Sequence, residues 1–201
     1  MPVIVTAAPL LLLWAIIGYG LGSIPFGLLL TRLMGLGNLR TIGSGNIGTT
    51  NVLRTGSKKA AALTLLLDGG KGAVAVFLAR MLAGEDAAQL AGLTAFLGHC
   101  FPIWLKFQGG KGVATFLGLM LALAWPVGIA CCLTWLAAAY LSKISSMGAL
   151  VSAVSAPLWC LLLGVPMTFL LSAVLAGLIL WRHKDNIVRL RLGNEPRIGQ
   201  K

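Results

Sequence analysis

Two glycine-rich segments of this sequence hold most of the groups that could bind an anion. The first lies between Gly35 and Ser57, where Gly, Ser, Thr, Asn and Arg replace the surrounding Leu and Ala. Glycines let backbone N–H groups approach an anion closely, and hydroxyl, amide and guanidinium groups suit phosphate oxygens. The candidate phosphate ligands are Gly43, Ser44, Gly45, Asn46, Thr50, Asn51 and Arg54. A plain turn-rich loop is the alternative, because glycine and asparagine also serve ordinary turns.

The second segment, Lys106–Gly112, resembles part of a nucleotide-binding P-loop. It lacks two of that loop's groups, because Leu105 stands where the first glycine belongs and Gly112 replaces the metal-binding hydroxyl. Glycines around Lys111, before a helix predicted to begin at Val113, still favour an anion site. Its candidate ligands are Gly109, Gly110 and Lys111. The alternative is an ordinary basic loop.

Neither segment is a nucleotide site. Residues 43–48 match the G-x-G-x-x-G spacing of dinucleotide-binding loops, but such a loop must follow a β-strand. We expect helices throughout the chain, so a Rossmann site is rejected.

Asp68 and Lys71 lie three residues apart within an apolar segment, a spacing that lets them share one helix face. Gly69 and Gly70 would weaken the helix between them. Ions inside a membrane are costly, so the pair indicates either a functional site, with Lys71 directed toward the anion, or a salt bridge that pins a broken helix. We favour a supporting role for Asp68.

The two histidines are both expected on the basic side of the chain. For His99 a structural role and a ligand role are equally open. His183 follows Arg182 and precedes Asn186 by three residues, so His183 and Asn186 would face the same way if the helix continues through them.

The composition indicates a membrane protein. Apolar residues make up 58% of the 201 residues and charged residues only 10%, whereas soluble domains carry about a quarter. The net charge of +11 would suggest nucleic acid in a soluble chain, but here it indicates anionic lipids and anionic substrates. Five scattered carboxylates and four cysteines without C-x-x-C spacing predict no metal site and no cofactor.

Seven apolar segments predict seven transmembrane helices. They are Ala7–Leu30, Ala60–Leu82, Ala87–Leu105, Val113–Trp125, Pro126–Leu141, Met147–Leu163 and Pro166–Trp181. Seven crossings place the basic loops and the basic tail on one face, and six would move the tail across, so the positive-inside rule favours seven. Because Val113–Trp125 is short, one kinked span over Val113–Leu141 is the alternative. We expect an all-α integral membrane protein, a single domain over residues 1–201, with the N-terminus outside, the C-terminus cytoplasmic and a break at Trp125-Pro126.

Taken together, these motifs resemble the bacterial acyl-phosphate-dependent glycerol-3-phosphate acyltransferases, integral membrane enzymes of phospholipid synthesis. The resemblance covers the whole chain. It rests on Ser23-Ile24-Pro25, the Arg40 to Arg54 loop, Asp68-Gly69-Gly70-Lys71-Gly72, Gly98-His99-Cys100-Phe101-Pro102, Gly109-Gly110-Lys111-Gly112-Val113-Ala114-Thr115, and Arg182-His183 with Asn186-Ile187. It implies transfer of an acyl chain from acyl phosphate to the sn-1 hydroxyl of glycerol 3-phosphate at the cytoplasmic face of the bacterial inner membrane. The products would be lysophosphatidic acid and phosphate.

The resemblance also implies the site residues. The functional set is Ser44, Arg54, Lys111, His183 and Asn186, with Lys71, His99 and Arg182 as further substrate ligands. Arg54 and Lys111 would bind phosphates, Ser44 would orient a phosphate or carbonyl, and His183 and Asn186 would position glycerol 3-phosphate. Acyl phosphate is already activated, so catalysis would come mainly from positioning and charge stabilisation. Hand-over of acyl phosphate from a soluble enzyme is a family expectation.

A small organophosphate transporter is the alternative function. Interrupted helices with ions at membrane depth also build transport sites. The predicted outer loops offer few polar groups for a route across the membrane, and this disfavours transport. The H-x-x-x-x-D box of the other acyltransferase class is missing after both histidines.

Overall fold

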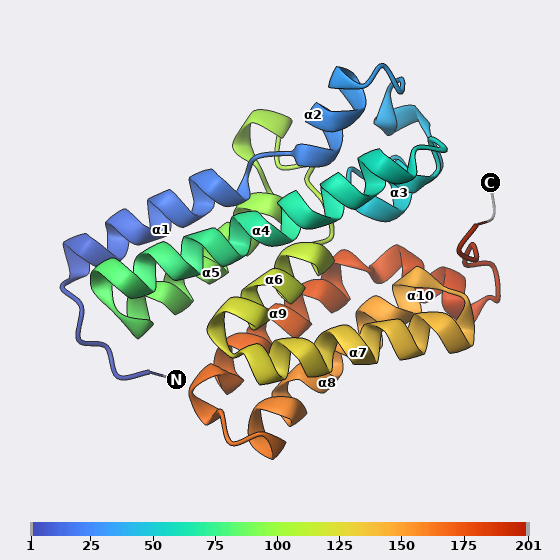
Figure 1. The fold of residues 1–201 in the computed structure, drawn as a ribbon. Coiled ribbons are helices and arrows are strands. Elements are labelled where there is room, and N and C mark those ends of the chain that lie inside the picture. The colour runs from blue at the N-terminus through green and yellow to red at the C-terminus, as the bar shows by residue number, and fades with distance from the viewer. Residues whose placement is uncertain (1, 200–201) are drawn as a thin grey trace.

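The protein is helical wherever the computed structural model describes it, over residues 2–199, and this range contains no β-strand (Figure 1). The α-helices are α1 (Ala8–Gly22), α2 (Phe26–Leu33), α3 (Thr49–Leu53), α4 (Lys58–Ala83), α5 (Glu85–Cys100), α6 (Val113–Leu123), α7 (Trp125–Ser142), α8 (Ser145–Leu162), α9 (Phe169–Arg182) and α10 (Lys184–Arg191). Short 3₁₀ turns lie at Leu39–Thr41, Ile103–Leu105 and Pro166–Thr168. The all-α prediction is confirmed.

Several helices are long and apolar enough to cross a membrane. Five spans within residues 2–199 meet that test by length and composition, with α1 and α2 counted as one, and a sixth is the pair α9 and α10, bent by 64°. The helix α6 has only 11 residues, fewer than the roughly 20 that a straight crossing needs. Each predicted apolar segment overlaps an α-helix, and the first contains α1 and most of α2 with a break between them. The count of seven crossings and their orientation stay predictions.

The chain reverses between α6 and α7. Gly128 in α7 packs so closely on α6 that a Cβ atom there would lie 2.4 Å from the backbone nitrogen of Leu121. A straight helix separates residues seven apart by about 10 Å, so one kinked span over both helices is excluded. The break lies at Ala124, one residue before the predicted Trp125-Pro126 position, because Pro126 is accommodated in the first turn of α7.

Small residues let the helix backbones approach one another. A Cβ on Gly22 in α1 would lie 1.9 Å from the carbonyl oxygen of Ala95 in α5. Close approach of this kind is how membrane helices pack without a hydrophobic driving force between them.

Gly69 in the middle of α4 serves the same packing, a Cβ on Gly70 beside it would meet nothing within 4 Å, and neither glycine breaks the helix. The helix runs without interruption for 26 residues, so the broken-helix interpretation is wrong. A Cβ on Gly118 in α6 would lie 2.1 Å from the carbonyl oxygen of Gly69. Gly69 therefore allows α6 to pack closely, and the neighbouring turns of α4 keep their helical hydrogen bonds.

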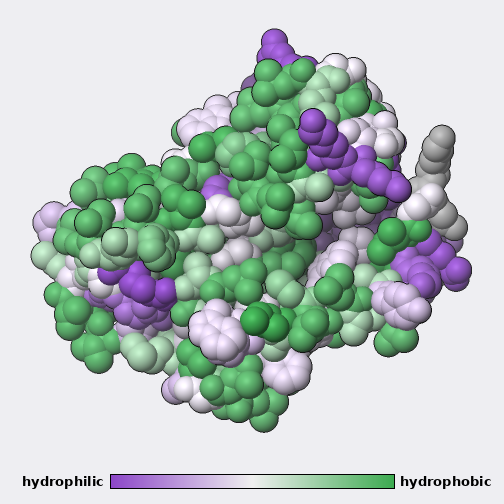
Figure 2. Space-filling model, viewed as in Figure 1, coloured by the Kyte–Doolittle hydropathy of each residue, from purple (hydrophilic) through white to green (hydrophobic). Residues whose placement is uncertain are grey.

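The outer surface is mostly apolar, and Figure 2 shows hydrophobic residues over most of one face. Exposed large side chains include Leu66, Phe77, Leu133, Leu136, Leu158 and Leu162. Hydrophilic residues on this face gather in a few places, one of them near the C-terminus. Figure 1 places α3, α10 and the C-terminus toward one end of the bundle, with the N-terminus toward the other.

Candidate functional site

The first glycine-rich loop, residues 38–57, is organised by the side chain of Asn51. Asn51 lies in α3 and is 2% exposed. Its Oδ1 accepts hydrogen bonds from the Ser44 backbone nitrogen at 3.1 Å, the Ser44 hydroxyl at 3.4 Å and Arg54 Nη1 at 3.2 Å. Its Nδ2 donates to the carbonyls of Leu39 and Asn46. Asn51 therefore holds Ser44 and Arg54 in place and has no group left for a phosphate, contrary to prediction.

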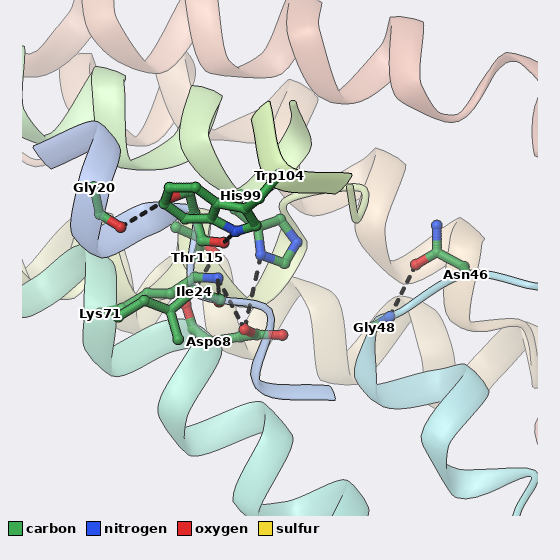
Figure 3. A network of polar contacts seen from close by, with 10 residues as sticks. Gly20, Ile24, Asn46, Gly48, Asp68, Lys71, His99, Trp104 and Thr115 are labelled. Atoms are coloured by element: carbon green, nitrogen blue, oxygen red, sulfur yellow. Dashed lines mark hydrogen bonds and ion pairs between the residues drawn. The ribbon is translucent and has the colours of Figure 1, made fainter. Parts of the chain in front are cut away.

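Backbone N–H groups of the first loop donate hydrogen bonds to acceptors within the loop itself. The amide of Gly45 donates to the Ile42 carbonyl, and the amide of Gly48 donates to Asn46 Oδ1 at 2.9 Å (Figure 3). The turn itself uses the Gly45 amide, so this donor is not directed to an anion, and a role for Gly45 at the anion stays a prediction. The side-chain Oδ1 of Asn46 is likewise occupied within the loop.

Gly43 is required for the side chain of Arg54 to lie where it does. Its φ of +52° is a conformation that L side chains rarely adopt. A Cβ there would lie 2.5 Å from Arg54 Cδ and 2.7 Å from Asn51 Oδ1. Gly43 thus makes room for the guanidinium group of Arg54.

The second loop folds back on the end of α5. The amide of Gly109 donates to the Cys100 carbonyl and that of Gly110 to the His99 carbonyl, at 3.1 and 3.0 Å. These amides were predicted to bind phosphate, and they are occupied instead, because the loop pairs with the last turn of the helix. What the loop presents is the side chain of Lys111.

Two arginines hold the carbonyl side of this loop. Arg182 donates to the carbonyls of Gly109 and Gly110, and Arg40 donates to that of Gln108. The Arg182 guanidinium also lies 5.0 Å from the centre of the Phe101 ring. Arg182 was predicted to contact substrate; its donors are directed to the loop, so it fixes the loop's position.

Lys111 belongs to a polar chain that crosses to the C-terminal segment. Its Nζ donates to Asn186 Oδ1, and Asn186 Nδ2 donates to Glu195 Oε1. Glu195 also accepts from the Ser146 hydroxyl and from Arg189 Nε, both at 2.7 Å. This chain brings together α8, α10, the second loop and the C-terminal segment.

The surroundings shift the pKa values of Lys111 and Glu195, the two ionisable groups of this hydrogen-bonded series. Burial lowers the pKa of the Lys111 ammonium group to about 8, although the Glu195 carboxylate counteracts this. Burial of Glu195 opposes ionisation, but hydrogen bonds from Asn186, Ser146 and Arg189 together lower its pKa. Glu195 is therefore an ionised acceptor, and Lys111 can lose its proton in mildly alkaline solution.

Sequence reasoning missed Glu195 as a member of the site. It contacts Ser146, which is 49 residues away in the chain, and no local motif links the two. A signal was available in the charges alone: Glu195 is the last of only five carboxylates and stands within the basic tail.

His183 is buried at the bend between α9 and α10, and it is 3% exposed. Its Nδ1 lies 2.8 Å from the Ile179 carbonyl, which can only accept, so in the neutral ring Nδ1 carries the proton and Nε2 does not. The condition that one helix continues through Arg182–Asn186 is not met, because α9 ends and α10 begins on either side of His183. Both His183, at the bend, and Asn186, in the first turn of α10, are buried.

A contact between hydroxyl groups joins the first loop to α8. Thr50 Oγ1 lies 3.0 Å from Ser145 Oγ, next to a cavity of about 160 Å³. The cavity is lined by Thr50, Leu53, Arg54, Gly56, Ser145, Pro196, Arg197, Ile198 and Gly199. The structure thus gathers the first loop and the C-terminal segment around Arg54.

Lys71 and His99 do not line the cavity beside Arg54. Lys71 Nζ donates to the Ile24 carbonyl at 2.7 Å and lies 3.0 Å from Asp68 Oδ1 (Figure 3). His99 is buried beneath Gly110. Both side chains are buried, which disfavours direct contact with substrate, and their role as substrate ligands stays a prediction. Lys71 forms the internal salt bridge that is the alternative.

No group of three or more His, Cys, Asp or Glu side chains that could hold a metal ion occurs within the described range, residues 2–199. The polar groups of the candidate site are cations, hydroxyls, amides and the carboxylate of Glu195.

The chain is similar to known proteins over nearly its whole length. The profile of a family described as Glycerol-3-phosphate acyltransferase matches residues 12–193. Two proteins of that name, from Ruegeria sp. (strain TM1040) and Ruegeria pomeroyi, are 75% and 70% identical over 201 residues, which is 100% of this chain and 100% and 99% of theirs. A crystal structure of PlsY (YgiH), described as an integral membrane glycerol 3-phosphate acyltransferase in its glycerol 3-phosphate form, has a TM-score of 0.88 and 38% identity, covering 94% of this chain and 96% of that chain. The lysophosphatidic acid form gives a TM-score of 0.85 and 35% identity, over 94% and 95%.

Proposed function

Because the chain belongs to the glycerol-3-phosphate acyltransferase family, we propose that it uses acyl phosphate as donor and acylates the sn-1 hydroxyl of glycerol 3-phosphate. The products are lysophosphatidic acid and inorganic phosphate. The family and the acyltransferase class come from the similarity of the whole chain. The donor and the acylated position are what the resemblance to acyl-phosphate-dependent enzymes implies, and the chemistry of the site supports the donor.

One observation carries the choice of donor: the histidine of the site has no carboxylate to orient it. His183 Nδ1 is directed to the Ile179 carbonyl, and Glu195 is occupied by hydrogen bonds from Ser146, Asn186 and Arg189. A hydroxyl group attacking a thioester needs a base such as a His-Asp pair. A mixed anhydride with phosphate is more reactive, and its leaving group can accept the proton itself.

The reaction proceeds by attack of the C1 hydroxyl oxygen on the acyl carbon. The new bond is the ester C–O bond, and the bond broken joins the acyl carbon to the bridging oxygen of the phosphate. The hydroxyl proton goes to the departing phosphate, so no proton acceptor on the protein is consumed. The protein contributes position and positive charge.

The roles of the side chains follow from where they lie. Arg54 and Lys111 bind the two phosphate groups and stabilise the departing one. Ser44, held by Asn51, donates its hydroxyl to a phosphate or the acyl carbonyl. Asn186 and the free Nε2 of His183 position glycerol 3-phosphate.

The membrane arrangement is part of the proposal. We assign the chain, a single domain, to the bacterial inner membrane with seven crossings, the N-terminus outside and the site at the cytoplasmic face. It is supported by the gathering of α3, α10 and the basic C-terminal segment at one end of the bundle (Figure 1). Acyl phosphate then reaches the site from the cytoplasm, handed over by a soluble enzyme that forms it.

The test supplies purified protein in lipid nanodiscs with labelled glycerol 3-phosphate and either palmitoyl phosphate or palmitoyl-CoA. We expect lysophosphatidic acid from palmitoyl phosphate alone, and its loss in Arg54→Ala. The matched control is Arg32→Ala, because Arg32 lies in α2 and lines a separate open pocket. Product from palmitoyl-CoA would overturn the donor, and product from neither donor together with glycerol 3-phosphate flux across vesicles would favour a transporter.

A further inference from the structure

A buried network of ionisable groups lies beneath the second glycine-rich loop (Figure 3). Asp68 and Lys71 come from α4 and His99 from the last turn of α5, with exposures of 2%, 6% and 4%. Asp68 Oδ1 lies 3.0 Å from Lys71 Nζ and 3.8 Å from His99 Nδ1. Ionisable groups inside membrane-spanning helices are costly, so their presence calls for a role that an apolar core would not fill.

The network also ties the surrounding helices together. Lys71 Nζ donates to the Ile24 carbonyl, at the junction of α1 and α2. The Thr115 hydroxyl, in the first turn of α6, donates to the backbone carbonyl of Asp68 at 2.9 Å. Thr115 lies three residues after the second loop and His99 seven residues before it, so the network contacts the chain on both sides of that loop.

Gly110 rests directly on the imidazole ring of His99. The Gly110 amide donates to the His99 carbonyl at 3.0 Å, and a Cβ on Gly110 would lie 2.1 Å from His99 Nε2. With Nδ1 facing Asp68 and Nε2 facing Gly110, the ring stands between the ion pair and the loop. Lys111 is the next residue, and its side chain contacts Asn186.

We propose that His99 is a positioning residue for Lys111: the Asp68–Lys71–His99 network fixes Gly110 and so sets where the Lys111 ammonium group meets the phosphate of glycerol 3-phosphate. The inference rests on the proposed function only for the contact between Lys111 and that phosphate. In this proposal Asp68, Lys71 and His99 act on the site through Gly110 and Lys111, without contacting the substrate themselves.

The contact between His99 and Gly110 is tested by a double-mutant cycle read out as the Kd for labelled glycerol 3-phosphate in nanodiscs, which needs no acyl donor. Gly110→Ala alone is expected to weaken binding about tenfold or more, because the new Cβ collides with the ring. In the His99→Ala background the same change is expected to cost less than about twofold. Gly109→Ala is the matched control: its Cβ would lie 2.1 Å from the His99 carbonyl oxygen, which the His99→Ala variant keeps, so its cost stays the same in both backgrounds.

The link to Lys111 is tested by adding Lys111→Ala. His99→Ala is expected to weaken binding severalfold in the wild-type background and to have no further effect once Lys111 is truncated, whereas a purely structural loss would persist. His99→Asn, which keeps a polar group near the position of Nδ1 but removes the Nε2 edge of the ring, is expected to fold and to bind between His99→Ala and wild type, with folding followed by monodispersity and Tm.

The outcomes separate the two proposals. Equal cost of Gly110→Ala in both backgrounds, or undiminished binding in His99→Ala and His99→Asn, would overturn the positioning role while Lys111→Ala still binds poorly. Undiminished binding in Lys111→Ala would instead overturn the phosphate role that the proposed function gives to Lys111.

Discussion

Replacing Glu195 tests the polar chain that reaches Lys111 through Asn186. Glu195→Ala removes the carboxylate that accepts from Asn186, Ser146 and Arg189. Asn186 would then be free to turn, and Lys111 would lose both its fixed partner and the favourable charge beyond it. The variant should fold with a loosened C-terminal segment and a misplaced ammonium group.

The magnitude follows from the hydrogen bonds lost. The bonds from Asn186 and Ser146 to an ionised acceptor contribute about 1.5 to 3 kcal/mol each. The Arg189 side chain is 38% exposed, so solvent reduces the contribution of its ion pair to about 0.5 kcal/mol. Only the part of this free energy that holds Lys111 in position affects the reaction. Loss of the hydrogen bond from Asn186 by itself predicts a fall in kcat/KM of about ten- to a hundredfold. Glu195→Gln keeps the shape and a neutral acceptor, so its loss should be smaller.

The assay is the initial rate of lysophosphatidic acid formation in nanodiscs over a range of glycerol 3-phosphate concentrations, with Tm measured on the same samples. Glu85→Gln is the matched control, because Glu85 also pairs with an arginine at 2.7 Å but begins α5 and takes no part in this chain. Wild-type kcat/KM in Glu195→Ala would refute the reasoning. So would an equal loss in Glu85→Gln.

Three other variants test the charge of Lys111, the support given by Asn51 and the packing of α1 on α5. Since burial lowers the pKa of Lys111 to about 8, its ammonium group is charged below that pH and neutral above it, so affinity for glycerol 3-phosphate should fall as pH rises through 8; in Lys111→Arg, measured by the same binding assay, that fall should vanish. Asn51→Leu should lower kcat/KM by about tenfold or more, because the serine and arginine that it holds are released, and an unchanged rate would contradict the described loop. Gly22→Ala should lower Tm, because its Cβ meets the Ala95 carbonyl at 1.9 Å, whereas Gly20→Ala, which meets nothing within 4 Å, should leave Tm unchanged.

The helices could be predicted because their signals are local. Each apolar segment has the length and composition of a helix in lipid, and the short α6 was already distinguishable by its length. The position of the α6–α7 break was wrong by one residue, because proline fits the first turn of a helix. The expected break in α4 is wrong because it rests on the low helix propensity of Gly69 and Gly70, whereas α4 stays continuous and Gly69 packs against α6.

The site could be predicted only by residue type. The loops that carry Arg54 and Lys111 stand out in composition, and the structure places both loops near the C-terminal segment. Which groups are free and which are occupied could not be read from the sequence. The amides of Gly109 and Gly110 are bonded to the end of α5, and the partners of Asn51 and Glu195 depend on chain segments that meet only in the fold.

The donor is the central claim, and a single-turnover experiment tests it most directly. Enzyme in nanodiscs, in excess over palmitoyl phosphate, is mixed with labelled glycerol 3-phosphate, and lysophosphatidic acid and inorganic phosphate are measured in the same samples. We expect both products to appear at one rate and in equal amounts, with the acyl group on the sn-1 oxygen. Phosphate released without lysophosphatidic acid, or lysophosphatidic acid formed from palmitoyl-CoA under the same conditions, would contradict it.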